Sequence, residues 1–182
     1  MRGLGVLRLV PPWALTLASL ALVLRGVDAV PGLVAGTPRG VSRHVTLEAA
    51  ERRVGFSILL PSYFPEELVW PPEEIATAGR SVALRFRGRD AGLALVLVEG
   101  PADGGVSETL LPRGEPFHTV DFDLGGRPAR LVDLRLPPDG TWHELSFVEA
   151  GRRVVLRFRG PSELFLRMAE SIRTRGRSGI AP

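Results

Sequence analysis

Two histidines and two aspartates are the side chains of this 182-residue sequence whose types and spacing most readily suggest chemistry. His118, Asp121 and Asp123 lie close together, and His143 follows in the next predicted hairpin. A metal site needs its ligands on one face, but the alternation of a strand places His118 on the face opposite to both aspartates. We therefore expect no metal, and we expect His118 and His143 to be inward or rim histidines, with a functional pair of the two as the alternative.

Arginines on two predicted strands form a second candidate site. Arg85 and Arg87 share one strand, and Arg153, Arg157 and Arg159 share another. Together they would form a basic surface for phospholipid headgroups or an acidic glycan. The simpler interpretation is a solvated face that prevents edge pairing and keeps the protein soluble. We keep Arg85, Arg87, Arg157 and Arg159 as the candidate binding surface.

Motifs of the familiar enzyme classes are missing from the sequence. It contains no Gly-x-Ser-x-Gly elbow, His-Glu-x-x-His helix, phosphate loop or dinucleotide fingerprint. Glu66-Glu67 and Glu73-Glu74 are adjacent acidic pairs in a proline-rich segment, not the opposed carboxylates that a glycosidase requires. We expect a protein that is not an enzyme, with no catalytic residues and no cofactor.

Composition restricts the partners further. The chain has no Cys, which excludes disulfides and thiolate sites. Its net charge is +3, but removing the six arginines and one aspartate of residues 1–29 and 173–182 leaves 17 arginines against 19 acids, a net charge of −2. Because nucleic-acid binding needs an excess of positive charge, we expect no nucleic-acid partner.

Residues 1–29 have the pattern of a signal peptide or a membrane anchor. Arg2 and Arg8 precede an uncharged run over residues 9–24, shorter than the ~20 residues that cross a bilayer comfortably. That length suits a signal peptide, and residues 27–29 resemble a cleavage site. Uncleaved, the run would anchor the protein in the cell membrane by a single pass, with an extracytoplasmic domain. Secretion after cleavage is the alternative, and a buried helix of a soluble protein is a third.

The remaining residues divide into three predicted parts. Residues 30–44, rich in Gly and Pro, predict a linker. Residues 45–173 predict one α+β domain, and the small and basic residues 174–182 predict a disordered tail.

The predicted domain begins with a short amphipathic helix and the stretch over residues 55–65. Thr46 is a suitable N-cap, and Gly55 provides a left-handed stop. A compact apolar strand is expected over residues 56–60, closed by Pro61. We expect this stretch to found the fold, and we expect binding chemistry elsewhere.

From residue 81 onward, alternation and turn residues predict successive antiparallel strands. These strands cover residues 81–87, 93–98, 117–124, 127–136, 142–149 and 152–159. The run over 93–98 is apolar on both faces and should be central, whereas residues 100–115 predict a mobile loop. A helix opening at Pro161 carries an apolar stripe that should pack on the sheet. The predicted fold is α+β, a mostly antiparallel meander sheet with a short N-terminal helix and a C-terminal helix packed on it.

Two of these strands share a short sequence motif. Residues 82–88 and 154–160 share the pattern Val-x-Leu-Arg-Phe-Arg-Gly. Their flanking residues differ, which favours a common strand composition over a duplicated half-domain.

Four segments resemble a bacterial extracytoplasmic family, the domain-of-unknown-function family 4367. They are residues 46–65, the Gly125-Gly126 hairpin, residues 145–151 and residues 163–172, and together they cover most of residues 45–173. The resemblance implies the exported part of a membrane-anchored or secreted protein, and it carries over no catalytic residue.

We therefore expect a non-enzymatic sensory or binding domain whose ligand is an unknown protein or small molecule. We expect its binding site on the sheet face that the helices leave open and in the 100–115 loop. The alternatives are a lipid or lipoprotein carrier with an apolar cavity, and a hydrolase that uses His118 and His143.

Overall fold

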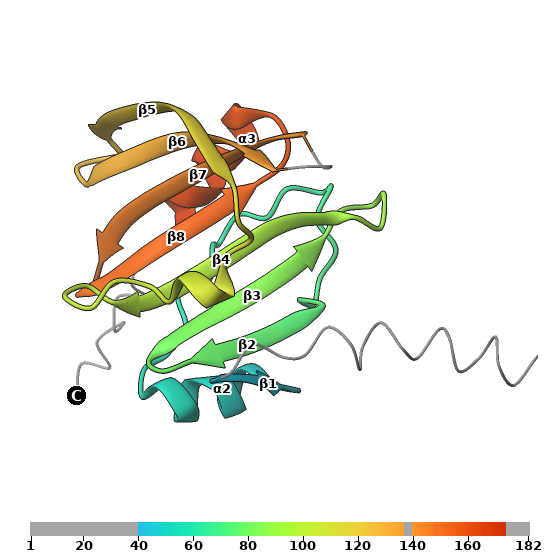
Figure 1. Ribbon diagram of the computed structural model, residues 1–182, viewed down its shortest axis with the longest axis vertical. Helices are drawn as coiled ribbons and strands as arrows, with labels where there is room; N and C mark the ends of the chain where they lie inside the picture. The colour runs from blue at the N-terminus through green and yellow to red at the C-terminus, as the bar shows by residue number, and fades with distance from the viewer. Residues whose placement is uncertain (1–39, 137–139, 174–182) are drawn as a thin grey trace, which may run out of the picture. The chain divides into compact units, whose positions relative to one another are not determined.

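The computed structural model describes residues 40–136 and 140–173, which form an antiparallel sheet with helices (Figure 1). The elements in chain order are β1 (Val41–His44), α2 (Leu47–Val54), β2 (Glu74–Ala78), β3 (Ser81–Arg87), β4 (Leu93–Pro101), the 3-10 helix η1 (Glu108–Leu110), β5 (Glu115–Asp123), β6 (Pro128–Leu136), β7 (Gly140–Glu149), β8 (Arg152–Phe158) and α3 (Ser162–Ser171). The predicted α+β fold, a mostly antiparallel meander sheet with one helix near each end of the domain, is confirmed.

The sheet consists of two meanders that meet in its middle. Its eight strands lie in the order β1-β2-β3-β4-β8-β7-β6-β5, and every neighbouring pair is antiparallel. Because β4 pairs with β8, strand β5 lies at the far edge of the sheet. The connection over residues 102–114 must therefore cross β8, β7 and β6 before β5 begins.

Each face of the sheet has its own cover. α3 packs on one face, where Phe165, Met168 and Ala169 are buried together with α2 residues and side chains of the 56–64 segment. The 102–114 connection covers part of the opposite face, with Leu110 of η1 buried against it. Figure 1 shows this connection in front of the sheet and α3 behind it. Strand β4 is consequently buried on both faces, as predicted for a central strand.

The structure corrects three local predictions. Residues 41–44 belong to the sheet as β1, so the predicted linker over 30–44 extends four residues too far. The apolar run over 56–60 is extended but is not a strand of the sheet. Strand β2 was not predicted, because Glu74–Ala78 has small residues and follows a proline-rich segment. The helix caps are confirmed: the Thr46 side chain accepts a hydrogen bond from the Ala49 N–H, and Gly55 has a φ of 82°.

The predictions for residues 1–29, for most of the linker, for the turn at 137–139 and for the tail over 174–182 lie outside the described residues. No helix within residues 40–136 and 140–173 is both long and apolar enough to cross a membrane.

Candidate functional site

The two candidate histidines converge on one carboxylate. His118, Asp133 and His143 are lateral neighbours on β5, β6 and β7. The His118 Nδ1 lies 3.2 Å from one Asp133 oxygen, and the His143 Nδ1 lies 2.7 Å from the other. Because an ionised carboxylate can only accept, both imidazoles must donate through Nδ1–H. Asp133, which the sequence analysis did not single out, is the residue that joins the pair.

The described contacts of this histidine pair are few. Within residues 40–136 and 140–173, neither imidazole is hydrogen-bonded to a hydroxyl nucleophile, and no His, Asp and Glu side chains gather as three metal ligands would. The His118 side chain is 59% exposed on an edge strand, whereas the His143 ring lies 6.3 Å from the ring of Phe165 in the core. The arrangement therefore fits a polar cross-link between three strands.

The arginines of β3 and β8 also meet, on the face opposite to α3. Arg85 and Arg157 flank Val96 of the central strand in one lateral row, and each is paired with an acid from the strand beyond it. Arg85 lies 3.5 Å from a Glu74 oxygen, and Arg157 donates to Glu144. The charges in this row are thus neutralised in pairs.

Both arginines also hold the crossing connection in place. Arg85 donates to the carbonyl oxygen of Leu110 at 3.3 Å, and Arg157 donates to the carbonyl oxygen of Pro112. The predicted open face and the predicted mobile loop are therefore packed against each other. The sequence predicted that these arginines could share a surface, but it did not predict the acids and carbonyls that they bind.

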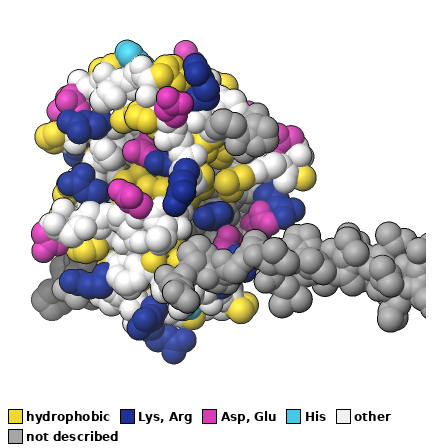
Figure 2. All heavy atoms as spheres, in the orientation of Figure 1, with side chains coloured by type: hydrophobic (Ala, Val, Ile, Leu, Met, Phe, Trp, Pro, Cys, Tyr) yellow, Lys and Arg dark blue, Asp and Glu magenta, His cyan; other side chains and the backbone are white. Residues whose placement is uncertain are grey.

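Arg87 and Arg159 are paired as well. Arg87 donates two hydrogen bonds to Glu73, and these hold the pKa of the Glu73 carboxyl below its ordinary value. Arg159 donates to Asp90. Figure 2 shows basic and acidic side chains interspersed over this face, with no single basic patch. The pairing of these charges argues against a surface for anionic headgroups. The solvated-face interpretation fits Arg87, but not Arg85 and Arg157, which the connection covers.

We expect Arg157→Ala to loosen the crossing connection. Without its hydrogen bond to Pro112, limited trypsin digestion should cut after the exposed Arg113 about fivefold faster, equivalent to ~1 kcal/mol. Mass spectrometry of the fragments measures this. Arg87→Ala, which removes an exposed ion pair on the same face, is the control and should leave the cut unchanged. Equal rates in the two variants would show that Arg157 does not hold the connection.

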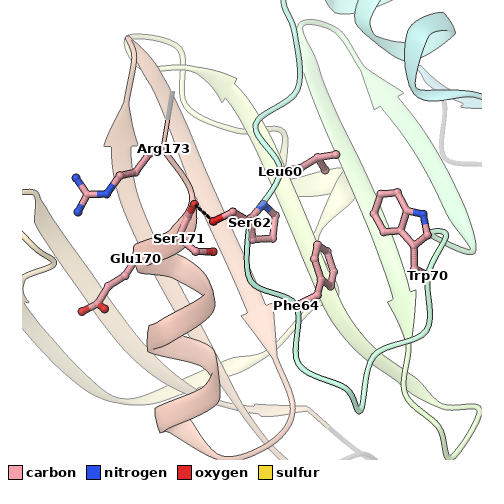
Figure 3. A pocket seen from close by; sticks show the side chains of 8 residues that line it. Leu60, Ser62, Phe64, Trp70, Glu170, Ser171 and Arg173 are labelled. Carbon is pink, nitrogen blue, oxygen red and sulfur yellow. Dashed lines mark hydrogen bonds between the residues drawn. The ribbon is translucent and has the colours of Figure 1, made fainter. Parts of the chain in front are cut away.

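Two adjoining hollows lie along the stretch that was predicted to be structural only. The first has a volume of about 600 Å³ and is lined by Leu60, Pro61, Ser62, Phe64, Trp70, Glu170, Ser171 and Arg173. Figure 3 shows Leu60, Phe64 and Trp70 on one side of it and Glu170 and Arg173 on the other. Between them, Ser62 donates to the carbonyl oxygen of Ser171 at 3.3 Å, which fastens the stretch to the end of α3.

The second hollow continues from the first, because Leu60 and Arg173 line both. It has a volume of about 470 Å³ and is lined by Glu51, Ser57, Ile58, Leu59, Leu60, Arg152 and Arg173. We call the two hollows together the groove. The groove corrects the expectation that binding chemistry lies away from residues 55–65, since this stretch forms its wall.

Aromatic rings give one end of the groove an apolar surface. Trp70 is 53% exposed, and its indole stacks on the buried ring of Phe86 with the centroids 5.9 Å apart. Phe64 meets the same indole edge-on at 5.6 Å. A half-exposed Trp that packs against two other rings is a typical apolar contact surface for a ligand.

At the other end of the groove, a buried acid of the sheet is hydrogen-bonded to the backbone of the groove wall. Glu99 of β4 is fully buried, and it accepts a hydrogen bond from the Leu59 N–H at 2.8 Å. Its second oxygen lies 3.3 Å from Arg152, which also donates to the carbonyl oxygen of Ser57. Burial raises the pKa of Glu99 to about 8, although Arg152 and the Leu59 N–H both lower it. Glu51 holds the Ile58 N–H in the same way at 2.8 Å.

Arg127 holds the end of α3 that borders the groove. Its guanidinium donates to the carbonyl oxygen of Ile172 at 2.7 Å and to that of Ala169 at 3.3 Å. These carbonyls lie at the C-terminal end of α3, where the Ala169 carbonyl also accepts from the Ile172 N–H at 3.2 Å. Arg127 thus sets the position of Ser171 and Arg173.

Sequence reasoning missed the groove because its residues come from distant segments. One signal was present: Glu99 is the single acid in the apolar run of β4, and a carboxylate in a central strand needs partners.

Comparisons of the chain with protein-family models, curated proteins and solved structures give no match. The resemblance to family 4367 therefore stays a prediction.

Proposed function

We propose that the domain is a non-enzymatic binding module and that the groove along residues 57–64 is its ligand site. The observation that carries this proposal is the half-exposed Trp70, which lines the first of two adjoining hollows. Three sets of hydrogen bonds hold the groove wall in place. They are made by Glu51, by Glu99 with Arg152, and by Ser171. A preformed site with an exposed aromatic side chain favours ligand binding because little ordering entropy is lost.

The two alternatives have less support. A lipid or lipoprotein carrier needs an apolar cavity under its sheet, whereas the residues of β4 are buried by packed side chains on both faces. A hydrolase would need His118 and His143 beside a substrate hollow, and neither lines the groove. The expectations that the N-terminal segment exports or anchors the domain, and that no nucleic acid binds, belong to this proposal and rest on the sequence.

Trp70→Ala is expected to weaken binding of an aromatic probe by about tenfold, equivalent to ~1.4 kcal/mol. The probe is 1-anilinonaphthalene-8-sulfonate, titrated by fluorescence. Phe117→Ala is a matched control, because Phe117 is an aromatic residue with a similar exposed fraction of 54% on β5. It should bind as the wild type does. Equal binding by all three proteins, or no binding by the wild type, would contradict the proposal.

A further inference from the structure

The second hollow contains two guanidinium groups with unused donors. Arg173 has no hydrogen bond or ion pair with the described residues. Arg152 makes both of its hydrogen bonds through one nitrogen, to Ser57 and Glu99, so its other nitrogens donate to no described acceptor. Its guanidinium also lies 5.3 Å from the ring centre of Phe56. Planar guanidinium groups with free donors match the two oxygens of a carboxylate.

The adjoining hollow determines what such a carboxylate is attached to. Trp70, Phe64 and Leu60 line the first hollow, and Arg173 lies where the two hollows meet. An apolar group on the aromatic side would therefore place an acidic end near Arg173, which also lines the second hollow with Arg152. Glu51, the acid that lines the second hollow, is already bound to the Ile58 N–H.

Resting on the proposed function, we propose that the ligand of the groove is an apolar carboxylate whose acidic end binds Arg152 and Arg173, and that ionisation of Glu99 weakens this binding. Three groups face Glu99: the guanidinium of Arg152 from β8, the carboxylate of Glu51 from α2 and the Leu59 N–H from the groove wall. While Glu99 is protonated, the charge of Arg152 attracts the ligand. Once Glu99 ionises, its carboxylate neutralises Arg152 from beneath.

The pH dependence has a definite sign. Burial raises the pKa of Glu99 to about 8, so the protonated form dominates at lower pH and the ionised form at higher pH. An alkyl carboxylate stays ionised over this whole range. The affinity for the carboxylate should therefore fall as the pH rises through about 8.

Two probes with the same chain separate the acidic end from the apolar part. Dodecanoate and dodecyltrimethylammonium, both below their micelle concentrations, are titrated against the full chain by calorimetry. We expect dodecanoate to bind about tenfold more tightly than the cation, and Arg173→Gln to remove that preference. Arg130→Gln, which removes an exposed arginine on the opposite face, should keep it. For Glu99→Gln, the affinity for dodecanoate should not change with pH.

Each outcome decides one point. Equal affinity for the two probes, still reduced by Trp70→Ala, would overturn the carboxylate inference and leave the groove as a binding site. Binding of neither probe, or binding that Trp70→Ala does not change, would overturn the proposed function itself. A wild-type preference for dodecanoate that is the same below and above pH 8 would overturn the role of Glu99 alone.

Discussion

Glu99→Gln is expected to make the protein more stable than the wild type at pH 8, by up to ~4 kcal/mol, and equally stable below about pH 4.5. In the folded wild type, burial raises the pKa of Glu99 to about 8, whereas in the unfolded chain it is near 4.5. Between these values the folded state binds one more proton than the unfolded state. The free energy of unfolding must therefore fall as the pH rises, by at most ~1.4 kcal/mol per pH unit.

Gln is the suitable replacement because it is neutral and nearly isosteric. Its carbonyl oxygen can still accept the hydrogen bond from the Leu59 N–H. In the wild type, the destabilisation by ionised Glu99 is absent below about pH 4.5. The free energy of unfolding then falls as the pH rises from about 4.5 through about 8. Gln cannot ionise, so the variant should show none of this loss.

Urea denaturation across this pH range measures both proteins. The difference between them isolates Glu99, because groups such as Glu73 and Asp121, whose pKa values are lowered by arginines, contribute equally to each. A variant that is less stable than the wild type by the same amount at every pH would contradict the prediction. It would mean that Glu99 is ionised in the folded protein and that its pair with Arg152 is stabilising.

The elements that the sequence predicts well are those with strong local patterns. The two strands that share a motif show why: β3 and β8 flank the same strand, β4, in matching register. Leu84 and Leu156 both lie beside Leu97, and Phe86 and Phe158 both lie beside Leu95. Similar neighbours on two sides of one apolar strand select similar sequences, which explains the repeat without a duplication.

The 56–60 segment shows where local patterns mislead. Its composition is that of a strand, but the N–H groups of Ile58 and Leu59 bond to the carboxylates of Glu51 and Glu99 instead of to another strand. One carboxylate from the preceding helix and one from a distant strand thus take the place of strand-to-strand hydrogen bonds. Because no neighbouring strand covers it, the segment lies at the edge of the core and forms the wall of the groove.

Long-range pairing is the second limit. Short turns predict which strands are sequential neighbours, but they do not predict that β4 pairs with β8 and sends β5 to the far edge. The connection over 102–114 covers the arginine face only because of that pairing. The candidate site on this face therefore could not be tested without the topology.

Arg127→Ala is expected to lower the free energy of unfolding by about 3–5 kcal/mol. The Arg127 side chain is only 11% exposed, and it donates to the carbonyls of Ala169, Glu170 and Ile172 and to the carboxylate of Glu149. Its guanidinium also lies 4.6 Å from the ring centre of Phe147. Truncation would remove this donor from the partly buried Ile172 carbonyl and from the partly buried Glu149 carboxylate, and such a loss costs more than the net value of the bonds.

Arg130→Ala is the matched control, since Arg130 lies three residues further along and pairs with Asp121, with both side chains at least 60% exposed. Loss of this exposed pair should change the free energy of unfolding far less, because solvent screens the two charges. Urea denaturation followed by circular dichroism compares the two variants. Arg127→Lys should be intermediate, because an ammonium keeps the charge but lacks the planar fork that spans several carbonyls. Equal losses for Arg127→Ala and Arg130→Ala would show that water satisfies the end of α3 as well as Arg127 does, and the position of Arg173 in the groove would then need another cause.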